Sequence, residues 1–362
     1  MHLRMSLASG WVPALVLSLS VAVLPESKPS PVTSTAPMAA ARSGHSATLL
    51  LNGKVLITGG VGKDGKILAA AELYDPETGK FSDAGSMLQG RTGHAAVRLV
   101  DSQVLLIGGT GPEGVLSSCE LYDQVTGKFT PAASMHQARN GPTATLLQDG
   151  RVLVTGGEDG SGASLSTAEY FTRRGQFREP RGMMSKARSR HSATQLPHER
   201  VLIAGGESAH GSVLSDAEMF DGEIDHFVPL PAMNSAREKH KTAVLSDGSI
   251  LIVGGQNANG TVATAELFDV PSRKFADGGK LVEPRSDFPP PLVLPDGRVV
   301  VVGGAKAIEI YDPAAHRFST AYGKMAPRSG QTATLLRNGK VLIVGGSDSK
   351  GKATAEAWLF TP

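Results

Sequence analysis

The stretch 42-RSGHSATLLLNGKVLITGG-60 contains two apolar runs joined by Asn-Gly and ends in a pair of glycines. Asn-Gly between two apolar runs is typical of a tight β-hairpin with a type I′ turn. Nearly the same phrase returns as 91-RTGHAAVRLVDSQVLLIGG-109 and as 328-RSGQTATLLRNGKVLIVGG-346. One copy predicts a hairpin, whereas several copies at one spacing predict a repeat architecture.

The glycine pair marks seven copies of one unit. The second glycines of successive pairs are 49, 48, 49, 49, 49 and 42 residues apart, so the units cover almost the whole chain after residue 31. We expect the pairs to be structural, because glycine adopts backbone conformations that other residues avoid. The glycines are Gly59, Gly60, Gly108, Gly109, Gly156, Gly157, Gly205, Gly206, Gly254, Gly255, Gly303, Gly304, Gly345 and Gly346.

Each unit carries four short strand signals, which in the first unit are residues 45–51, 54–60, 69–75 and 81–87. A four-stranded antiparallel unit cannot bury both of its faces alone, and packing such units around an axis solves this. The chain ends in a third strand at 355–362, and the segment 32–38 has the spacing of the missing fourth strand. We therefore predict an all-β, seven-bladed β-propeller with four antiparallel strands per blade, its last blade completed by an N-terminal strand.

The repeat resembles the kelch family in its glycine pair, in the aromatic residue of its third strand and in the Arg-x-x-His lead-in to its first strand. The resemblance covers roughly residues 32–362 and implies a propeller of the galactose oxidase type. The family's usual fourth-strand tryptophan is replaced here by Phe81, Phe129, Phe177, Phe227, Phe275 and Phe318. Propellers host unrelated activities, so the resemblance predicts the fold and leaves the function open.

The first 22 residues are predicted to be a signal peptide. Arg4 precedes an apolar run at 11–24, and small residues at positions 20 and 22 suit cleavage after Ala22. The run is too short to cross a bilayer comfortably, so we expect no membrane span in the mature chain. Residues 23–31 form a polar spacer before the propeller at 32–362. We expect an exported protein, whether periplasmic, cell-surface or secreted.

Composition excludes several classes of function. A net charge of +2 over 362 residues gives no general attraction to nucleic acid. The single cysteine, Cys119, stands where other units have alanine, so we expect a small core residue. No zinc, calcium or phosphate-binding signature occurs. We therefore expect a monomer with no metal and no cofactor.

Two charged residues recur in every unit and are predicted to form structural ion pairs. A reaction centre needs a residue once or twice, whereas every blade needs its own fixing contact. The glutamates stand in the third strand at Glu72, Glu120, Glu169, Glu218, Glu266, Glu309 and Glu356. The arginines open the lead-ins at Arg42, Arg91, Arg139, Arg188, Arg237, Arg285 and Arg328.

The lead-ins of units four to six differ from the others. Two residues after the arginine, four units have glycine, and the next residue is usually histidine. Strand order places the lead-ins and the long loops on one face of a propeller, where binding residues are usually found. We expect an acidic ligand, such as a sugar acid or a carboxylate-bearing peptide, because these units have two cations. The alternative is solvated charge beside histidines that cap the inner strands. The candidate ligand-binding residues are Arg190, His191, Lys239, His240, Asp287 and Phe288.

Unit six is irregular, and we predict a notch there. Gly304 lies five residues before Glu309, against ten to twelve residues in the other units. Its first strand, 288-FPPPLVL-294, holds three prolines, which a strand with a free edge tolerates. A lowered rim and the apolar Phe288 should therefore form a notch beside Lys239 and Asp287, and this notch is the first choice for a site. A separate cationic run at 173–190 predicts either an anionic surface partner such as polysaccharide or a solvated edge.

The fold suggests three functions, of which the first does not fit this sequence. Copper-radical oxidases share the fold, but their chemistry needs a Cys–Tyr pair at the mouth, and this chain has its cysteine in a third strand. Exported sialic-acid mutarotases suit the size and the basic mouth, with His191 or His240 as the acid–base group. The preferred prediction is a non-enzymatic scaffold that binds a protein or a glycan through the loop-rich face.

Overall fold

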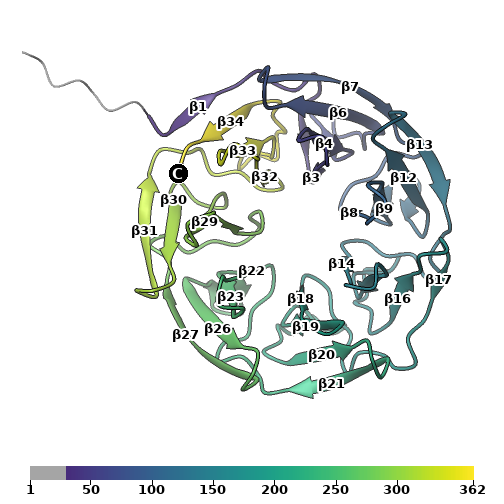
Figure 1. Ribbon diagram of the computed structural model, residues 1–362, viewed down its shortest axis with the longest axis vertical. Helices are drawn as coiled ribbons and strands as arrows, with labels where there is room; N and C mark the ends of the chain where they lie inside the picture. Colours follow the sequence, from purple (N-terminus) through teal and green to yellow (C-terminus); the bar gives the residue numbers. More distant parts are fainter. Residues whose placement is uncertain (1–29) are drawn as a thin grey trace, which may run out of the picture. The chain divides into compact units, whose positions relative to one another are not determined.

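The structure is a computed structural model that describes residues 30–362, so the predicted signal peptide and most of the spacer lie outside the described residues. Residues Pro31–Pro362 form one compact unit. Seven four-stranded antiparallel sheets surround a central axis in it, which confirms the predicted propeller (Figure 1). The described part of the chain has no helix, and hence none that is long and apolar enough to cross a membrane.

The sheets are numbered as blades in chain order, and each runs from the axis outward. Blade 1 has β3 (Ser46–Leu49), β4 (Val55–Thr58), β6 (Ala70–Asp75) and β7 (Lys80–Ser86). Blade 2 has β8 (Ala95–Arg98), β9 (Val104–Ile107), β12 (Cys119–Asp123) and β13 (Lys128–Ala132). Blade 3 has β14 (Thr143–Leu146), β15 (Val152–Thr155), β16 (Ala168–Phe171) and β17 (Phe177–Arg178). Blade 4 has β18 (Ser192–Leu196), β19 (Arg200–Ala204), β20 (Ala217–Asp221) and β21 (His226–Leu230).

The remaining blades follow the same order. Blade 5 has β22 (Lys241–Val244), β23 (Ile250–Val253), β26 (Thr264–Asp269) and β27 (Lys274–Lys280). Blade 6 has β28 (Leu292–Val293), β29 (Val299–Val301), β30 (Ile308–Asp312) and β31 (Arg317–Tyr322). Blade 7 has β32 (Thr332–Leu335), β33 (Val341–Val344), β34 (Ala357–Phe360) and β1 (Val32–Ser34).

The N-terminal strand closes the ring as predicted. β1 pairs antiparallel with β34, and Val32 lies opposite Phe360. The N–H of Thr361 also donates to the carbonyl of Pro31 at 2.8 Å. Strand pairing between the two ends gives blade 7 its fourth strand and closes the ring.

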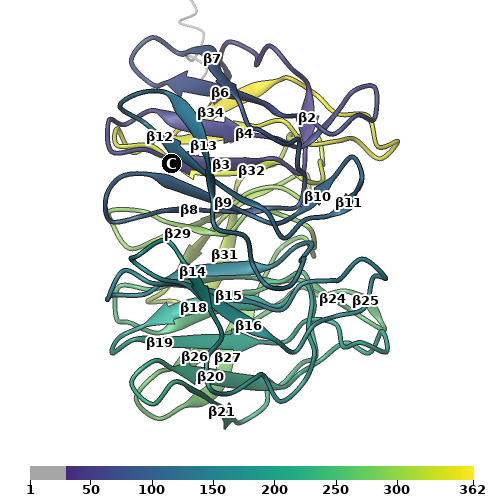
Figure 2. The same ribbon diagram turned by 90° about the vertical axis from the view of Figure 1, so that its right-hand side faces the viewer.

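Loops on one face carry three short two-stranded ladders. They pair β2 (Arg42–Ser43) with β5 (Val61–Gly62), β10 (Thr110–Gly111) with β11 (Gly114–Val115), and β24 (Gln256–Asn257) with β25 (Gly260–Thr261). In the side view these strands stand together on one side of the blades (Figure 2). The lead-ins and the long loops therefore share a face, which is called the loop-rich face below.

The core is divided into layers between adjacent blades. Every residue of the second strands in blades 1, 2 and 3 is buried, as expected of strands covered on both faces. Between blades 7 and 1, for example, Val55 and Ile57 pack against Leu342 and Val344. Each of blades 1 to 6 adds a tilted aromatic pair from its two outer strands, with ring centroids 4.7 to 5.2 Å apart. Blade packing thus uses the repeated apolar positions of the sequence.

The predicted type I′ turn is wrong. In the first hairpin only Gly53 has a positive φ, of 85°, and its N–H donates to the carbonyl of Leu50 at 3.1 Å. The Asn52 side chain accepts the N–H of Lys54 at 3.0 Å. The loop therefore has three residues, a type I turn followed by a left-handed glycine, because the asparagine side chain stabilises a right-handed backbone at its own position.

The first strand of blade 6 is also shorter than predicted. β28 has two residues, whereas the first strands of the other blades have four or five. Prolines 289–291 precede it and have no N–H to donate to the neighbouring strand, so pairing begins only at Leu292.

Candidate functional site

Six of the seven lead-in arginines are fully buried and fix the crossover from the preceding blade. In blade 1, Nη2 of Arg42 donates to Glu72 at 2.7 Å, and Nη1 donates to the carbonyls of Gly59 and Ala70 at 2.9 Å. Glu72 also accepts the N–H of Ala39 at 2.7 Å, which ties down the incoming chain. The buried N···O pairs measure 2.5 to 3.2 Å and are Arg42–Glu72, Arg91–Glu120, Arg139–Glu169, Arg188–Glu218, Arg237–Glu266 and Arg285–Glu309.

The structure places His191 and His240 inside the blade interfaces, where both side chains are buried. Nε2 of His191 lies 3.1 Å from the hydroxyl of Thr143, and Nε2 of His240 lies 2.9 Å from that of Ser192. Burial, reinforced by the nearby lead-in arginine, lowers the pKa of His240 to about 3 and that of His191 well below its ordinary value. Both rings are therefore neutral and form hydrogen bonds to the preceding blade, so the expectation that they bind an acidic ligand is revised.

Two further histidines, His45 and His94, make the same contact. Their Nε2 atoms lie 2.9 Å and 3.1 Å from hydroxyls of the preceding blade. The sequence contained a signal for this contact. The residue of the preceding blade that lies opposite the histidine is Ser or Thr wherever the next blade has histidine. Where it is instead Ala95, Lys241 or Pro289, the next blade has Pro142, Phe288 or Gln331.

Phe288 is likewise a core residue and does not line the rim. Its side chain is 3% exposed and packs with Leu251 and Leu267 between blades 5 and 6. A Cβ on Gly254 would lie 3.2 Å from its ring, so the glycine pair and the phenyl ring are closely packed. The predicted apolar wall of the notch is therefore absent, since the ring is covered by both blades.

The residues two positions after each arginine surround the axis, and backbone hydrogen bonds join four neighbouring pairs of them. The N–H of Gly44 donates to the carbonyl of Gly330 at 2.9 Å, Gly93 donates to Gly44 at 3.2 Å, and Lys239 donates to Arg190 at 2.9 Å. All seven have positive φ, between 54° and 67°. These ring positions are Gly44, Gly93, Gly141, Arg190, Lys239, Asp287 and Gly330.

Three adjacent ring positions hold strained residues. Arg190, Lys239 and Asp287 adopt the left-handed conformation, which costs a non-glycine residue roughly 1–2 kcal/mol. Four other blades relieve that cost with glycine at the same position. Strain that persists at a rim position indicates a role for the side chain beyond folding.

Arg190 is not free to bind an anion. Its guanidinium contacts Glu158 at 3.1 Å, Glu207 at closer range and Glu238 at 3.3 Å. Gln256 donates to Glu238 at 2.6 Å on the other side. Three carboxylates surround one cation, so this part of the mouth carries net negative charge, contrary to the predicted basic mouth. These glutamates were not among the predicted site residues, although two of them directly follow glycine pairs where other blades have neutral residues.

The environments of Glu207 and Glu238 separate their pKa values. Burial raises the pKa of Glu207, and its hydrogen bond to Glu238 raises it further, although Arg190 opposes both. Burial also disfavours the ionised form of Glu238, but hydrogen bonds from Gln256 and Arg190 outweigh it and lower its pKa. The pair therefore contains one carboxyl group that holds its proton more tightly and one that gives it up more readily.

The predicted notch beside Lys239 and Asp287 is present as a hollow of about 370 Å³ over blades 5 to 7. It is lined by Lys239 and Arg328, by Asp287 and Asp348, and by four serine hydroxyls. In six blades the residue before the ring position pairs with the residue after the glycine pair; the described part of blade 6 has no such bridge. The short loop of blade 6 therefore opens the rim at this place.

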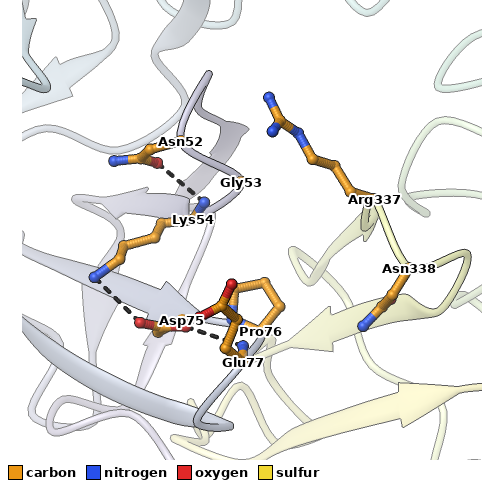
Figure 3. A pocket seen from close by; sticks show the side chains of 8 residues that line it. All are labelled: Asn52, Gly53, Lys54, Asp75, Pro76, Glu77, Arg337 and Asn338. Atoms are coloured by element: carbon orange, nitrogen blue, oxygen red, sulfur yellow. Dashed lines mark hydrogen bonds and ion pairs between the residues drawn. The ribbon is translucent and has the colours of Figure 1, made fainter.

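A second hollow, of about 350 Å³, lies on the opposite face between the first hairpins of blades 7 and 1 (Figure 3). Lys54 pairs with Asp75 at 3.1 Å, and Asp75 accepts the N–H of Glu77 at 2.9 Å. Arg337 donates to the carbonyl of Leu51. These polar groups of the second hollow already stabilise the turns that carry them. The notch on the loop-rich face is therefore the better candidate site.

The described residues do not fit a copper centre. In residues 30–362, no three His, Cys, Asp or Glu side chains are grouped so that they could hold a metal ion. Cys119 is buried in β12, and burial raises the pKa of its thiol to about 12, which disfavours a thiolate ligand.

Comparisons with known proteins support the fold. The Kelch motif model matches residues 41–88 and 91–136, which correspond to blades 1 and 2. A fungal alcohol oxidase of the AA5 family, solved in complex with copper, is 17% identical with a TM-score of 0.74, over 91% of this chain and 76% of its own. The structure of YjhT is 13% identical with a TM-score of 0.60, over 89% of this chain and 95% of its own.

At these identities the two structures inform the fold alone. A comparison with curated protein sequences gives no match. The repeated glycine pairs, the matched motifs and the seven sheets agree with one another. The chain therefore carries Kelch motifs in blades 1 and 2 and folds as a seven-bladed β-propeller.

Proposed function

We propose that the propeller is a non-enzymatic binding module that takes a glycan in the notch over blades 5 to 7. The observation that carries this proposal is the hollow of about 370 Å³ lined almost entirely by charged and hydroxyl side chains. Its volume is within the range of small-ligand pockets, about 300–1,000 Å³. Export remains a prediction from the leader sequence.

The lining suits a polyhydroxylated ligand. Four serine hydroxyls both donate and accept, Asp287 and Asp348 accept, and Lys239 donates. The side chains of Lys239 and Asp287 form no hydrogen bond or ion pair within residues 30–362, and the carboxylate of Asp287 acts on Lys241 only through a coulombic interaction, so both side chains are available. Their backbone strain is unexplained by folding, because glycine at the same ring position satisfies four other blades.

Replacing both strained residues with glycine tests the notch. The Lys239→Gly/Asp287→Gly variant copies the other blades and should keep its free energy of unfolding within about 1 kcal/mol of the parent. Binding of sugars should be lost, as measured by calorimetry and by thermal shift. Ligand at 100 times its dissociation constant stabilises a protein by about 2.7 kcal/mol, which a thermal scan detects.

A matched control uses the hollow on the opposite face. Lys54→Ala/Glu77→Ala removes the same charges from the hollow between blades 7 and 1 and should leave sugar binding intact. Unchanged binding by the glycine variant would place the ligand elsewhere on the molecule.

One observation favours an enzyme that acts on an acidic sugar, of the mutarotase type. The carboxyl pair Glu207–Glu238 has pKa values displaced in opposite directions, the arrangement that supplies an acid and a base from two similar groups. These glutamates would replace His191 and His240 as the acid–base groups. Nuclear magnetic resonance of anomer exchange in a sugar acid would test this, since Glu207→Gln should abolish any acceleration by the parent protein.

A further inference from the structure

Arg328 is the exception among the seven lead-in arginines. The other six side chains are fully buried, and each donates from Nη1 to the carbonyl of a glycine pair. The Arg328 side chain is 13% exposed, and its one hydrogen bond within residues 30–362 runs from Nη2 to Glu356 at 2.6 Å. Glu356 is 58% exposed, whereas its six counterparts are at most 6% exposed.

The cause is a lead-in that is one residue short. Blade 2 is entered through 87-MLQGR-91, but blade 7 is entered through 325-MAPR-328. Both segments start from the same anchor, since the N–H of Met87 donates to Ala69 at 2.9 Å and that of Met325 donates to Lys306 at 3.0 Å. The other six lead-in arginines occupy a buried position, which is called the socket below. With one residue fewer after the anchor, the Arg328 side chain does not fully enter its socket.

Pro327 reinforces this displacement. Proline fixes its own backbone and restricts the residue before it, so the short segment cannot fold inward. In blade 1, Glu72 accepts two backbone N–H groups of the incoming lead-in, from Ala39 and Ala40. Glu356 accepts none from residues 323–327, which leaves it at the surface beside Arg328.

The displaced guanidinium is held in place and has free donors. Glu356 binds it on one side, and its carbon atom lies 5.1 Å from the centroid of the Trp358 ring. Nη1 has no partner within residues 30–362, and the side chain lines the notch together with Lys239. A guanidinium that is stacked and anchored in this way is pre-oriented for a carboxylate, which it can bind through two parallel hydrogen bonds.

We infer that Arg328 binds the carboxylate of an acidic sugar in the notch. Lys239 supplies a second positive charge, while Asp287 and the serine hydroxyls hold the sugar hydroxyls. A sugar is favoured over a peptide because Pro327 is the only apolar side chain among the described residues that line the notch. This inference rests on the proposed glycan-binding function of the same site.

Two pairs of sugars isolate the contribution of the carboxylate. Glucuronate and glucose, and galacturonate and galactose, differ at the carboxylate and are titrated calorimetrically into the parent chain. The parent should bind each acid about tenfold more tightly than its neutral partner, as expected of a charged bidentate contact. Arg328→Gln should reduce the affinity for the acid to that for the neutral sugar and leave the neutral sugar unchanged.

A second variant keeps the arginine and restores its socket. Inserting Gln after Ala326 and replacing Pro327→Gly gives blade 7 the lead-in spacing of blade 2. Burial of the guanidinium should raise the melting temperature and abolish the preference for acids. Retained preference in both variants would overturn the role of Arg328 while leaving the notch as a sugar site. No binding of any of the four sugars by the parent would overturn both proposals.

Discussion

Arg285 and Arg328 open the lead-ins of adjacent blades, yet their side chains have different environments. Arg285 and its partner Glu309 are both 0% exposed, and Glu309 accepts the N–H groups of Val282 and Glu283. Arg328 is paired with a glutamate that is mostly in solvent. The residue types and their order in the repeat are the same, so the difference comes from the length of the connecting segment.

The contrast shows how a repeat protein gains a site without new residue types. Three residues between the anchor Leu281 and Arg285 allow the guanidinium to be buried, whereas two residues between Met325 and Arg328 leave Arg328 facing the notch. The shortened loop of blade 6 then exposes that guanidinium, since no rim bridge covers it within the described residues. Two deletions in neighbouring segments thus turn a structural group into a candidate binding group.

Neutralising the two glutamates should give the largest difference. Glu309→Gln leaves the buried charge of Arg285 without a counterion and should lower the free energy of unfolding by about 3–5 kcal/mol. Glu356→Gln removes an exposed partner and should cost less than about 1 kcal/mol. Urea denaturation measures both, and equal losses would show that the two pairs are energetically alike.

Acid sensitivity should distinguish the regular blades from blade 7. His240 has a pKa of about 3 in the fold against an ordinary 6.5, so below pH 6.5 the unfolded chain binds a proton that the folded chain does not. Stability therefore falls with pH, by about 2 kcal/mol for this residue at about pH 5.

His240→Gln copies Gln331 of blade 7 and should remove that part of the loss. The comparison is made between denaturation curves at about pH 7 and pH 5 for parent and variant. An identical decrease in both proteins would mean that His240 titrates normally in the fold.

The ring positions should give the smallest effect. A Cβ at Gly141 would meet nothing within 4 Å, so Gly141→Lys, which copies Lys239, should cost only about 1 kcal/mol of backbone strain. Gly330→Lys should cost more, because its Cβ would lie 2.8 Å from the backbone nitrogen of Gly44. A strongly destabilising Gly141→Lys would mean that other contacts offset the backbone strain at Lys239, and that the ring geometry does not show them.

The architecture could be predicted from the sequence alone. Seven glycine pairs, four strand signals in each unit and a spare N-terminal strand allow one closed arrangement, because each unit must cover both faces with its neighbours. Comparison of the units also separated shared residues from exceptions, and it placed the notch beside Lys239 and Asp287. These inferences rely on local patterns that recur, so each copy supports the others.

Which of the exceptional side chains reach solvent could be seen only in the folded molecule. His191 and His240 are buried because each contacts a hydroxyl of the preceding blade 48 positions away in sequence, and Phe288 is buried because it packs against Leu251 and Leu267 of the preceding blade. Arg190 is neutralised by carboxylates from three blades, and Arg328 leaves its socket because of a single missing residue. Burial and charge balance depend on contacts between blades, and a single sequence gives the spacing of residues along the chain but not which neighbours cover them.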